Sequence, residues 1–305
     1  MELIYVNDDI SIKIIEKVIA TIGMFDGVHL GHDKVLKELK NESASLNLPS
    51  AVITFKEHPD FILDKKNLGY LMTFEERIEE LSKYDLNYCI VFSFTKEFSL
   101  ITHERFEKIL KEKINVQKLV LGNDTKYGYQ GKGNVETLAK VFPVKVVSDY
   151  MINGKCVHSS LIREMLASGN LLEANECLGR NFLISGNVSK GSKLGQNNNV
   201  RTANLELDNN YEYIKNGVYG VYIYVDKKKY LGICNIGHNP TFNYVERKRL
   251  EVNIFDFFED IYGQRIKVEL VIFLRDEIKF SSKEELYSQI HQDIKRVKEE
   301  MKIWE

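Results

Sequence analysis

The chain has few cysteines, little excess charge and no long apolar run. Its four cysteines lie far apart and form no CxxC pair, which disfavours a zinc site or a disulfide framework. The net charge of −2 lacks the basic signature of nucleic-acid binding. No apolar run approaches the length of about 18 residues that a membrane span needs. The first ten residues contain acidic side chains and no long apolar core, so we expect no signal peptide.

What the chain does contain is typical of an ordinary globular protein. Hydrophobic residues make up 44% and charged residues 28% of its 305 residues, enough for about two domains of normal size. We find no internal repeat, low-complexity segment or long linker, so we expect the domains to be joined directly. The separated cysteines fit a reducing compartment, and we expect a cytoplasmic protein. Whether the chain forms a homo-oligomer or binds a protein partner stays open.

The first part of the chain alternates short apolar runs with helical patterns. The predicted strands include Val18–Ala20, Ala51–Phe55, Tyr88–Phe94, Lys118–Gly122 and Val144–Ser148. Between them we expect helices, one opened by a capping box at Thr73–Glu76 and one opened by Thr102. This alternation predicts an α/β domain over residues 1–183, with a parallel sheet and helices on both of its faces.

The pattern changes near residue 183, where β-rich runs take over. The six predicted strands are Phe182–Val188, Ala203–Leu207, Val218–Val225, Tyr230–Asn235, Leu250–Phe257 and Ile266–Leu274. Their short spacing predicts a small antiparallel β-barrel over residues 184–305. One helix closes this domain. Its predicted capping box is Ser282–Glu285, and its predicted core face is made by Leu286, Ile290, Ile294 and Val297.

The stretch Thr21–His32, TIGMFDGVHLGH, stands at the centre of the first domain. It reads as a strand end, a glycine loop and a helix start. The N–H groups at a helix start are unpaired donors and favour an anion, and the spacing of His29 and His32 places both imidazoles on one side of the first turn. These groups suit charge that develops on a phosphate. From spacing alone, the two histidines could equally be a chance surface pair or half of a metal site.

As a whole string, this stretch resembles the HxGH signature of the nucleotidyltransferase superfamily, and GxFDGVHxGH is similar to the bacterial FAD synthetase module. The resemblance implies that His29 and His32 are catalytic. It also implies nucleotide binding by Gly23, Phe25 and Gly31.

Two later loops leave predicted strands at the same edge of the sheet, where ligands bind in such folds. Gly122–Gly128 resembles the family loop G-x-D-F-x-F-G, with Thr125 and Tyr127 in its aromatic positions. The resemblance implies a nucleotide contact for Asp124. It implies flavin contacts for Phe55, His58, Pro59 and Tyr127. Without that context, a loop of Gly, Asn and Asp is usually only a turn.

The segment Val157–Arg163 resembles the ISSTxxR segment of nucleotidyltransferases, with His158 and Leu161 as departures. The resemblance implies that Ser159, Ser160 and Arg163 hold ATP phosphates. Taken alone, two serines before a helix are most often an N-cap, and an arginine there most often lies in solvent.

The second domain resembles riboflavin kinases, whose hallmark is a glycine-rich stretch ending in PTAN. The matching residues begin with Gly186–Gly191, Gly195 and Arg201–Leu205. The roles that the resemblance implies are ATP binding by Gly191 and Gly195, Mg²⁺ binding by Thr202 and Asn204, flavin binding by Arg275, and base catalysis by Glu251. Without the match, Thr and Asn in a turn and an exposed Glu on a strand are ordinary. Asn199, Arg201 and Asn253 depart from the family pattern.

Together the two resemblances predict a bifunctional enzyme. One domain phosphorylates riboflavin with ATP to FMN, and the other transfers AMP from ATP to FMN, giving FAD and pyrophosphate. Two alternatives stay open. One is an adenylyltransferase whose barrel has lost its kinase activity, an alternative that the departures Asn199 and Arg201 leave open. The other is a non-catalytic flavin sensor that controls a partner.

Overall fold

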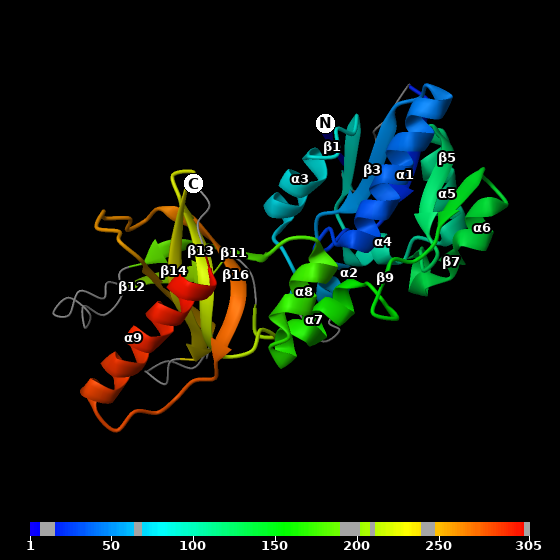
Figure 1. Cartoon of the computed structure of the whole chain (residues 1–305). Helices are drawn as coiled ribbons and strands as arrows, with labels where there is room; N and C mark the ends of the chain where they lie inside the picture. Colours follow the sequence, from blue (N-terminus) through cyan, green and yellow to red (C-terminus); the bar gives the residue numbers. More distant parts are fainter. Residues whose placement is uncertain (7–15, 64–68, 190–201, 208–210, 239–247, 302–305) are drawn as a thin grey trace. The chain divides into compact units, whose positions relative to one another are not determined.

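The computed structural model describes residues 1–6, 16–63, 69–189, 202–207, 211–238 and 248–301 (Figure 1). They form two compact units. The N-terminal unit comprises Met1–Asn67 and Thr73–Ser159, and the C-terminal unit comprises Leu68–Met72 and Ser160–Glu305. Among the described residues, no helix combines the length and the apolar character needed to cross a membrane.

Six parallel strands form the sheet of the N-terminal unit, in the order β1-β4-β3-β2-β5-β8. Their bounds are β1 Glu2–Val6, β2 Val18–Ile22, β3 Ser50–Phe55, β4 Tyr88–Phe92, β5 Val116–Gly122 and β8 Val144–Val147. Every residue of β2 is buried, as expected for a parallel strand covered on both faces. The predicted parallel α/β sheet is therefore confirmed.

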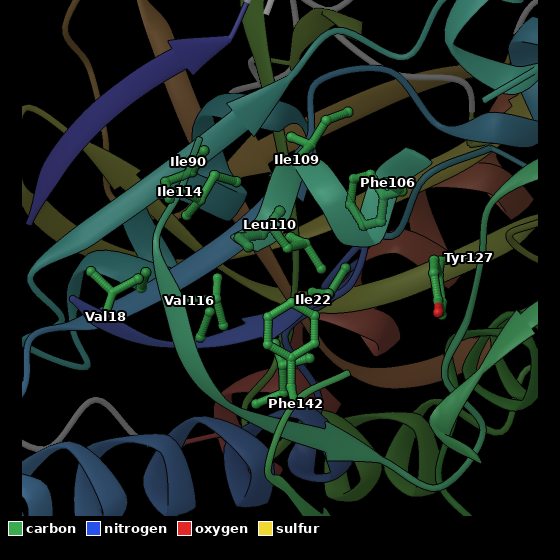
Figure 2. Close-up of a cluster of buried hydrophobic side chains, with 14 of the residues drawn as sticks. Val18, Ile22, Ile90, Phe106, Ile109, Leu110, Ile114, Val116, Tyr127 and Phe142 are labelled. Carbon is green, nitrogen blue, oxygen red and sulfur yellow. The ribbon is translucent and has the colours of Figure 1, made fainter. Parts of the chain in front are cut away.

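Helices cover this sheet on both faces. They are α1 Leu30–Leu46, α2 Pro59–Ile62, α3 Phe74–Ser82, α4 Lys96–Ser99, α5 His103–Glu112 and α6 Val135–Ala139. Val18 and Ile22 of β2 pack with Phe106 and Leu110 of α5 in the cluster that Figure 2 shows. Side chains alternate along a strand, so Ile19 and its neighbours face the other side, and α1 also packs against β2.

Short elements complete the N-terminal unit. They are the 3₁₀ turn η1 Tyr129–Gly131 and the two-residue strands β6 Lys126–Tyr127, β7 Gly133–Asn134, β9 Met151–Ile152 and β10 Lys155–Cys156. The predicted capping box of α3 is present, because Thr73 N–H donates to Glu76 Oε2 at 2.8 Å and Glu76 N–H donates to Thr73 Oγ1 at 3.2 Å. Helix α1 stops at its C-cap Asn47, which has the left-handed φ of 51°.

A closed antiparallel barrel forms most of the C-terminal unit, in the strand order β11-β12-β15-β14-β13-β16. Its strands are β11 Phe182–Ser189, β12 Thr202–Leu207, β13 Gly217–Val225, β14 Lys228–His238, β15 Lys248–Ile254 and β16 Arg265–Arg275. The hairpin between β13 and β14 turns at Asp226 and Lys227, which both have positive φ, as two-residue hairpin turns require. The predicted barrel is confirmed.

Three helices belong with the barrel. They are α7 Ser159–Ser168, whose first residue falls in the N-terminal unit, α8 Leu171–Leu178 and α9 Lys283–Glu300. Asn175 of α8 donates to Leu270 O at 3.0 Å and accepts from Phe182 N–H at 2.8 Å, so α8 is bonded to the barrel strands. The boundary between the two compact units therefore follows Ser159. The predicted boundary at residue 183 marks a change in sequence pattern and stays a prediction.

Helix α9 closes the barrel as predicted, with Val297 fully buried and Ile290 and Ile294 packed against the same apolar cluster. Its predicted capping box is only half correct. Ser282 Oγ accepts from Glu285 N–H at 3.2 Å, but the Glu285 carboxylate accepts from Ser281 N–H at 3.1 Å instead of from Ser282. The extended chain before Ser282 brings the N–H of Ser281 into the capping position.

Candidate functional sites

The loop that carries His29 and His32 follows β2, at a point where the order of the strands reverses. The chain moves from β2 to β3 and β4 on one side of the sheet, and then to β5 and β8 on the other side of β2. In open α/β sheets, ligands bind beside the carboxyl ends of the strands at such a switch point. The loops after β2, β3 and β5 all leave the sheet at this edge.

His29 is the N-cap of α1. Its Nδ1 accepts a hydrogen bond from the backbone N–H of His32 at 3.4 Å. We expected the N–H groups of this first turn to be unpaired, and for His32 that expectation is wrong, because an imidazole itself caps the helix. Because Nδ1 accepts this bond, Nε2 is the ring nitrogen of His29 that can carry a proton. Nε2–H is then a hydrogen-bond donor.

The two imidazoles stack on each other, with ring centroids 3.7 Å apart and an angle of 18° between the planes. The predicted common side of the turn is thus observed. Phe25 packs against His32 with a centroid distance of 5.1 Å. Phe25 and His29 are buried, at 2% and 5% exposed. This packing fixes both histidine rings before any substrate arrives.

Gly31 leaves room for the His29 ring. A Cβ added at Gly31 would lie 3.0 Å from His29 Cε1 and 3.1 Å from Val157 O, closer than nearly all real Cβ contacts. Gly23 does the same for Phe25, since its added Cβ would lie 3.2 Å from Phe25 Cε2. The glycines of the motif therefore allow aromatic rings to lie close to the backbone.

The backbone of this loop has a strained conformation. Phe25 has a φ of 53° and Val28 a φ of 35°, which non-glycine residues seldom adopt. Ser159 Oγ donates to Asp26 O at 2.8 Å and ties the start of α7 to the loop. The predicted phosphate-binding hydroxyl of Ser159 thus also has a structural partner.

The loop after β3 holds the predicted flavin residues Phe55, His58 and Pro59. His58 is the N-cap of α2, and its Nδ1 accepts from Asp60 N–H at 3.2 Å, while Pro59 opens the helix. The Phe55 ring lies among Phe92, Phe94 and Phe98. Since β3 adjoins β2, the structure brings these residues to the same sheet edge as the histidine loop.

Tyr127, predicted to contact flavin, lies instead in the apolar core (Figure 2). Its ring is 7% exposed and packs against Phe106. Its hydroxyl bonds Glu107 and Thr137, and burial followed by the bond to Glu107 raises its pKa. The side chain therefore has structural partners in the core, and the expected flavin contact stays a prediction. Asp124, three residues earlier, is exposed on the loop after β5.

Ser160 and Arg163 lie in the first turns of α7, within the C-terminal unit. Ser160 is exposed, and Arg163 Nε donates to Gly69 O at 2.9 Å. This bond joins α7 to the segment Leu68–Met72. Their phosphate contacts stay a prediction.

The sequence analysis missed Arg77, which belongs to α3 and is 2% exposed. Its Nη1 donates to Met24 O at 2.9 Å, and its Nη2 donates to Phe55 O at 2.5 Å and Lys56 O at 3.3 Å. Met24 belongs to the histidine loop and the other two carbonyls end β3. In the sequence, Arg77 has the pattern of a solvated helix residue, so nothing distinguishes it from its exposed neighbours.

In the barrel, three predicted kinase residues share one face. Asn204 on β12 lies directly opposite Glu251 on β15, and Thr202 lies opposite Asn253. Residues opposite each other in an antiparallel pair share a face, with Cβ atoms about 5 Å apart. Leu250 and Val252 are 0% exposed and face the other way, into the barrel. The structure therefore places Thr202, Asn204 and Glu251 together on the outer face.

This polar row continues onto β14. Asn235 lies opposite Glu251, and its Nδ2 donates to Glu277 Oε1 at 3.4 Å. The sequence predicted Asn235 only as the end of a strand and gave it no functional role. Glu251 is partly exposed, which leaves its carboxylate accessible to a substrate. The row combines hydroxyl, amide and carboxylate oxygens on three adjacent strands.

Arg275, predicted to contact flavin, is instead bound by Asp293 of α9. Its Nε donates to Asp293 Oδ2 at 3.0 Å, and its Nη2 donates to the same atom at 2.8 Å. The two side chains are 18% and 6% exposed. A planar guanidinium suits this paired geometry, so Arg275 fastens α9 to β16. The expected flavin contact of Arg275 stays a prediction beside this structural role.

The predicted ATP-binding residues Gly191 and Gly195, with the departures Asn199 and Arg201, lie outside the described residues. In the part of the chain that is described, no group of three or more His, Cys, Asp and Glu side chains could hold a metal ion. The oxygens of Thr202, Asn204 and Glu251 are of the kind that Mg²⁺ prefers, and few protein ligands suffice when phosphate oxygens supply the rest. The residues thus fit an ion that arrives with a nucleotide.

Comparison with known families agrees with this division into two sites. The FAD synthetase family model matches residues 11–161, and the riboflavin kinase family model matches residues 178–301. The class of protein is therefore one that combines an FAD synthetase domain with a riboflavin kinase domain.

Curated relatives match almost the whole chain. The bifunctional riboflavin kinase/FMN adenylyltransferase of Listeria monocytogenes is 35% identical over 285 residues, covering 92% of this chain and 90% of the relative. The enzyme of the same name from Bacillus subtilis is also 35% identical, covering 91% of this chain and 90% of the relative. The chain belongs to the bifunctional riboflavin kinase/FMN adenylyltransferase family.

A solved structure from Streptococcus pneumoniae, titled as a macrolide-efflux protein, has a similar fold. The TM-score is 0.87 at 28% identity, and the match covers 98% of this chain and 99% of that one. The architecture of both units is thus represented by an experimental structure.

Proposed function

We propose that the C-terminal unit phosphorylates riboflavin to FMN with ATP, and that the N-terminal unit adenylylates FMN to FAD with release of pyrophosphate. Both activities follow from membership of the family. The residue roles below are our assignment. The observation that supports this assignment is that the chain holds two preorganised sites. One is the stacked histidine pair at the switch point of the sheet, and the other is a carboxylate in register with hydroxyl and amide oxygens on the barrel.

In adenylyl transfer, an oxygen of the FMN phosphate attacks the α-phosphorus of ATP, and the bond to pyrophosphate breaks. The attacking oxygen is already anionic, so no strong base is needed. The barrier is then lowered by orientation and by donors directed at the developing charge. His29 supports this role because its accepting Nδ1 leaves a proton on Nε2. His32, held between His29 and Phe25, supplies the second imidazole.

In the kinase reaction, a primary alcohol of riboflavin attacks the γ-phosphorus of ATP, and ADP leaves. The alcohol must lose its proton, and the Glu251 carboxylate is our candidate for the base. The Thr202 hydroxyl and the Asn204 amide oxygen would hold Mg²⁺ together with ATP phosphates. The ion would neutralise charge on the phosphates. The position of Asn204 opposite Glu251 supports a base beside the metal-bound nucleotide.

A purified sample supplied with riboflavin, ATP and Mg²⁺ tests the proposal by chromatography of the flavins and a pyrophosphate assay. We expect FMN to appear first, followed by FAD with one pyrophosphate for each FAD formed. FAD from supplied FMN without any conversion of riboflavin would indicate a lapsed kinase barrel. Tight flavin binding with no consumption of ATP would indicate a sensor.

The cellular setting is also a proposal. None of the four cysteines, all of which are described, forms a disulfide, and burial raises the pKa of the Cys89 thiol to about 12, so this thiol stays protonated at neutral pH. Reduced cysteines support a cytoplasmic enzyme. The substrates ATP, riboflavin and FMN are small molecules, and the acidic net charge gives no support for a nucleic-acid partner.

A further inference from the structure

Arg77 links two loops that lie next to each other at the edge of the N-terminal sheet. Each of its two terminal nitrogens donates to a different loop. Nη1 donates to Met24 O at 2.9 Å, and Nη2 donates to Phe55 O at 2.5 Å. Nη2 also reaches Lys56 O at 3.3 Å. A guanidinium can bind two loops at once because it is planar and offers donors in a fixed fork.

The two loops carry the two halves of the proposed adenylyl-transfer site. Met24 immediately precedes Phe25, whose φ of 53° begins the strained turn to His29. Phe55 is the last residue of β3, and Lys56 follows it two residues before His58. The distance between these carbonyls therefore sets the distance between the histidine pair and the proposed flavin loop.

Arg77 is itself firmly held. It lies in the first turns of α3, directly after the capping box that Thr73 and Glu76 form. Its Cζ lies 5.3 Å from the centroid of the Phe74 ring, and the residue is 2% exposed. A side chain held in this way can transmit a fixed geometry to both loops.

We propose that Arg77 is a positioning residue for FMN adenylylation, because it fixes the loop after β2 against the loop after β3. This inference rests on the proposed function of the N-terminal unit. Arg77 acts through backbone carbonyls, so its loss displaces the catalytic and acceptor groups relative to each other. Misplacement by about 1 Å is enough to cost roughly 10²-fold in rate.

Three variants separate this role from general support of the fold. Arg77→Met keeps the apolar stem and removes every donor. Arg77→Lys keeps the charge but replaces the fork by a single ammonium, which cannot span both loops in the same way. Thr54→Val is the matched control, because Thr54 Oγ1 donates to the same Met24 O at 3.3 Å but binds neither Phe55 O nor Lys56 O, the two carbonyls that Arg77 also holds.

The measurement is kcat and KM for FAD formation from supplied FMN and ATP, with FMN formation from riboflavin as the internal control. We expect kcat to fall about 10²-fold in Arg77→Met and about tenfold in Arg77→Lys, and less than about threefold in Thr54→Val. KM for ATP should change by less than about threefold, and FMN formation by less than about twofold. Thermal unfolding and limited proteolysis report whether each variant is folded.

Wild-type kcat in Arg77→Lys would overturn the proposal, as would a rise in KM alone, which indicates direct substrate binding. An effect of Thr54→Val as large as that of Arg77→Met would also overturn it, because anchoring Met24 would then suffice. If Arg77→Met does not fold, the proposal is judged by comparing the kcat for FAD formation of Arg77→Lys with that of Thr54→Val. Absence of FAD formation by the wild-type protein would contradict the proposed function itself, whereas active wild-type and fully active variants contradict only this inference.

Discussion

The two candidate sites are built in different ways. In the N-terminal unit, His29 ends a short loop whose shape depends on non-glycine residues with positive φ and on rings packed against glycines, and His32 follows in the first turn of α1. In the barrel, Thr202, Asn204 and Glu251 lie on regular strands and are brought together by register alone. A strained loop keeps its conformation only when the surrounding residues hold it in place. Paired strands keep theirs through the hydrogen bonds between their backbones. The first site should therefore be more sensitive to substitutions outside its catalytic residues.

The largest effect is expected in the barrel. Glu251→Gln removes the proposed base and keeps the size of the side chain, so FMN formation should fall by about 10²–10⁴-fold. FAD formation from supplied FMN should not change, because that reaction belongs to the other unit. Both rates are measured on one preparation. Full FMN formation by this variant would remove Glu251 as the base.

His32→Ala is the corresponding change in the N-terminal unit. Loss of one fixed donor should lower the turnover of FAD formation by about 10²–10³-fold. FMN formation from riboflavin should continue at the wild-type rate, so FMN should accumulate. Equal loss of both activities, or of neither, counts against the assignment.

Gly31→Ala tests the sensitivity of the histidine pair without removing a catalytic side chain. The added methyl would press on the His29 ring and on Val157 O, so we expect FAD formation to fall about tenfold, equivalent to ~1.4 kcal/mol in the barrier. Gly154→Ala is the control in the same unit. Gly154 has a positive φ, of 75°, so alanine there strains the backbone, but its added Cβ meets nothing within 4 Å. A loss of FAD formation in Gly154→Ala as large as that in Gly31→Ala would show that the contact with the His29 ring is not needed for the loss.

The smallest effect on catalysis is expected from Asp293→Asn, which breaks the charge pair between α9 and Arg275. A guanidinium that loses a buried carboxylate should reduce the free energy of unfolding by about 2 kcal/mol, as measured by chemical denaturation. The exposed pair Lys295–Glu299 provides the control, and Glu299→Gln should cost less than about 0.5 kcal/mol. If Asp293→Asn instead abolishes flavin binding while stability is unchanged, the predicted flavin contact of Arg275 is supported and the fastening of α9 is not its main role.

The fold could be predicted largely from the sequence because its signals are local. Alternating apolar runs gave the strands, and Thr73–Glu76 gave a helix start that the structure confirms. The row of Thr202, Asn204 and Glu251 follows once the strands are paired. The register itself was not readable from the sequence, since it depends on contacts between distant segments.

The remaining features depend on burial, which a short motif does not encode. Tyr127 occupies an aromatic position of the family loop, yet its hydroxyl is satisfied by Glu107 and Thr137 within the core. Arg275 is bound by Asp293, a residue 18 positions away. Arg77 looks like a solvated helix residue and is almost completely buried. In each case the partner lies too far along the chain for local spacing to reveal it.

The most direct test of two independent sites is complementation between the two catalytic variants. Glu251→Gln and His32→Ala proteins are supplied with riboflavin, ATP and Mg²⁺, separately and mixed, and the flavins are separated by chromatography. Our account predicts little FMN or FAD from Glu251→Gln alone, FMN that accumulates with His32→Ala alone, and FAD from the mixture. A mixture that makes no more FAD than either variant alone would contradict it.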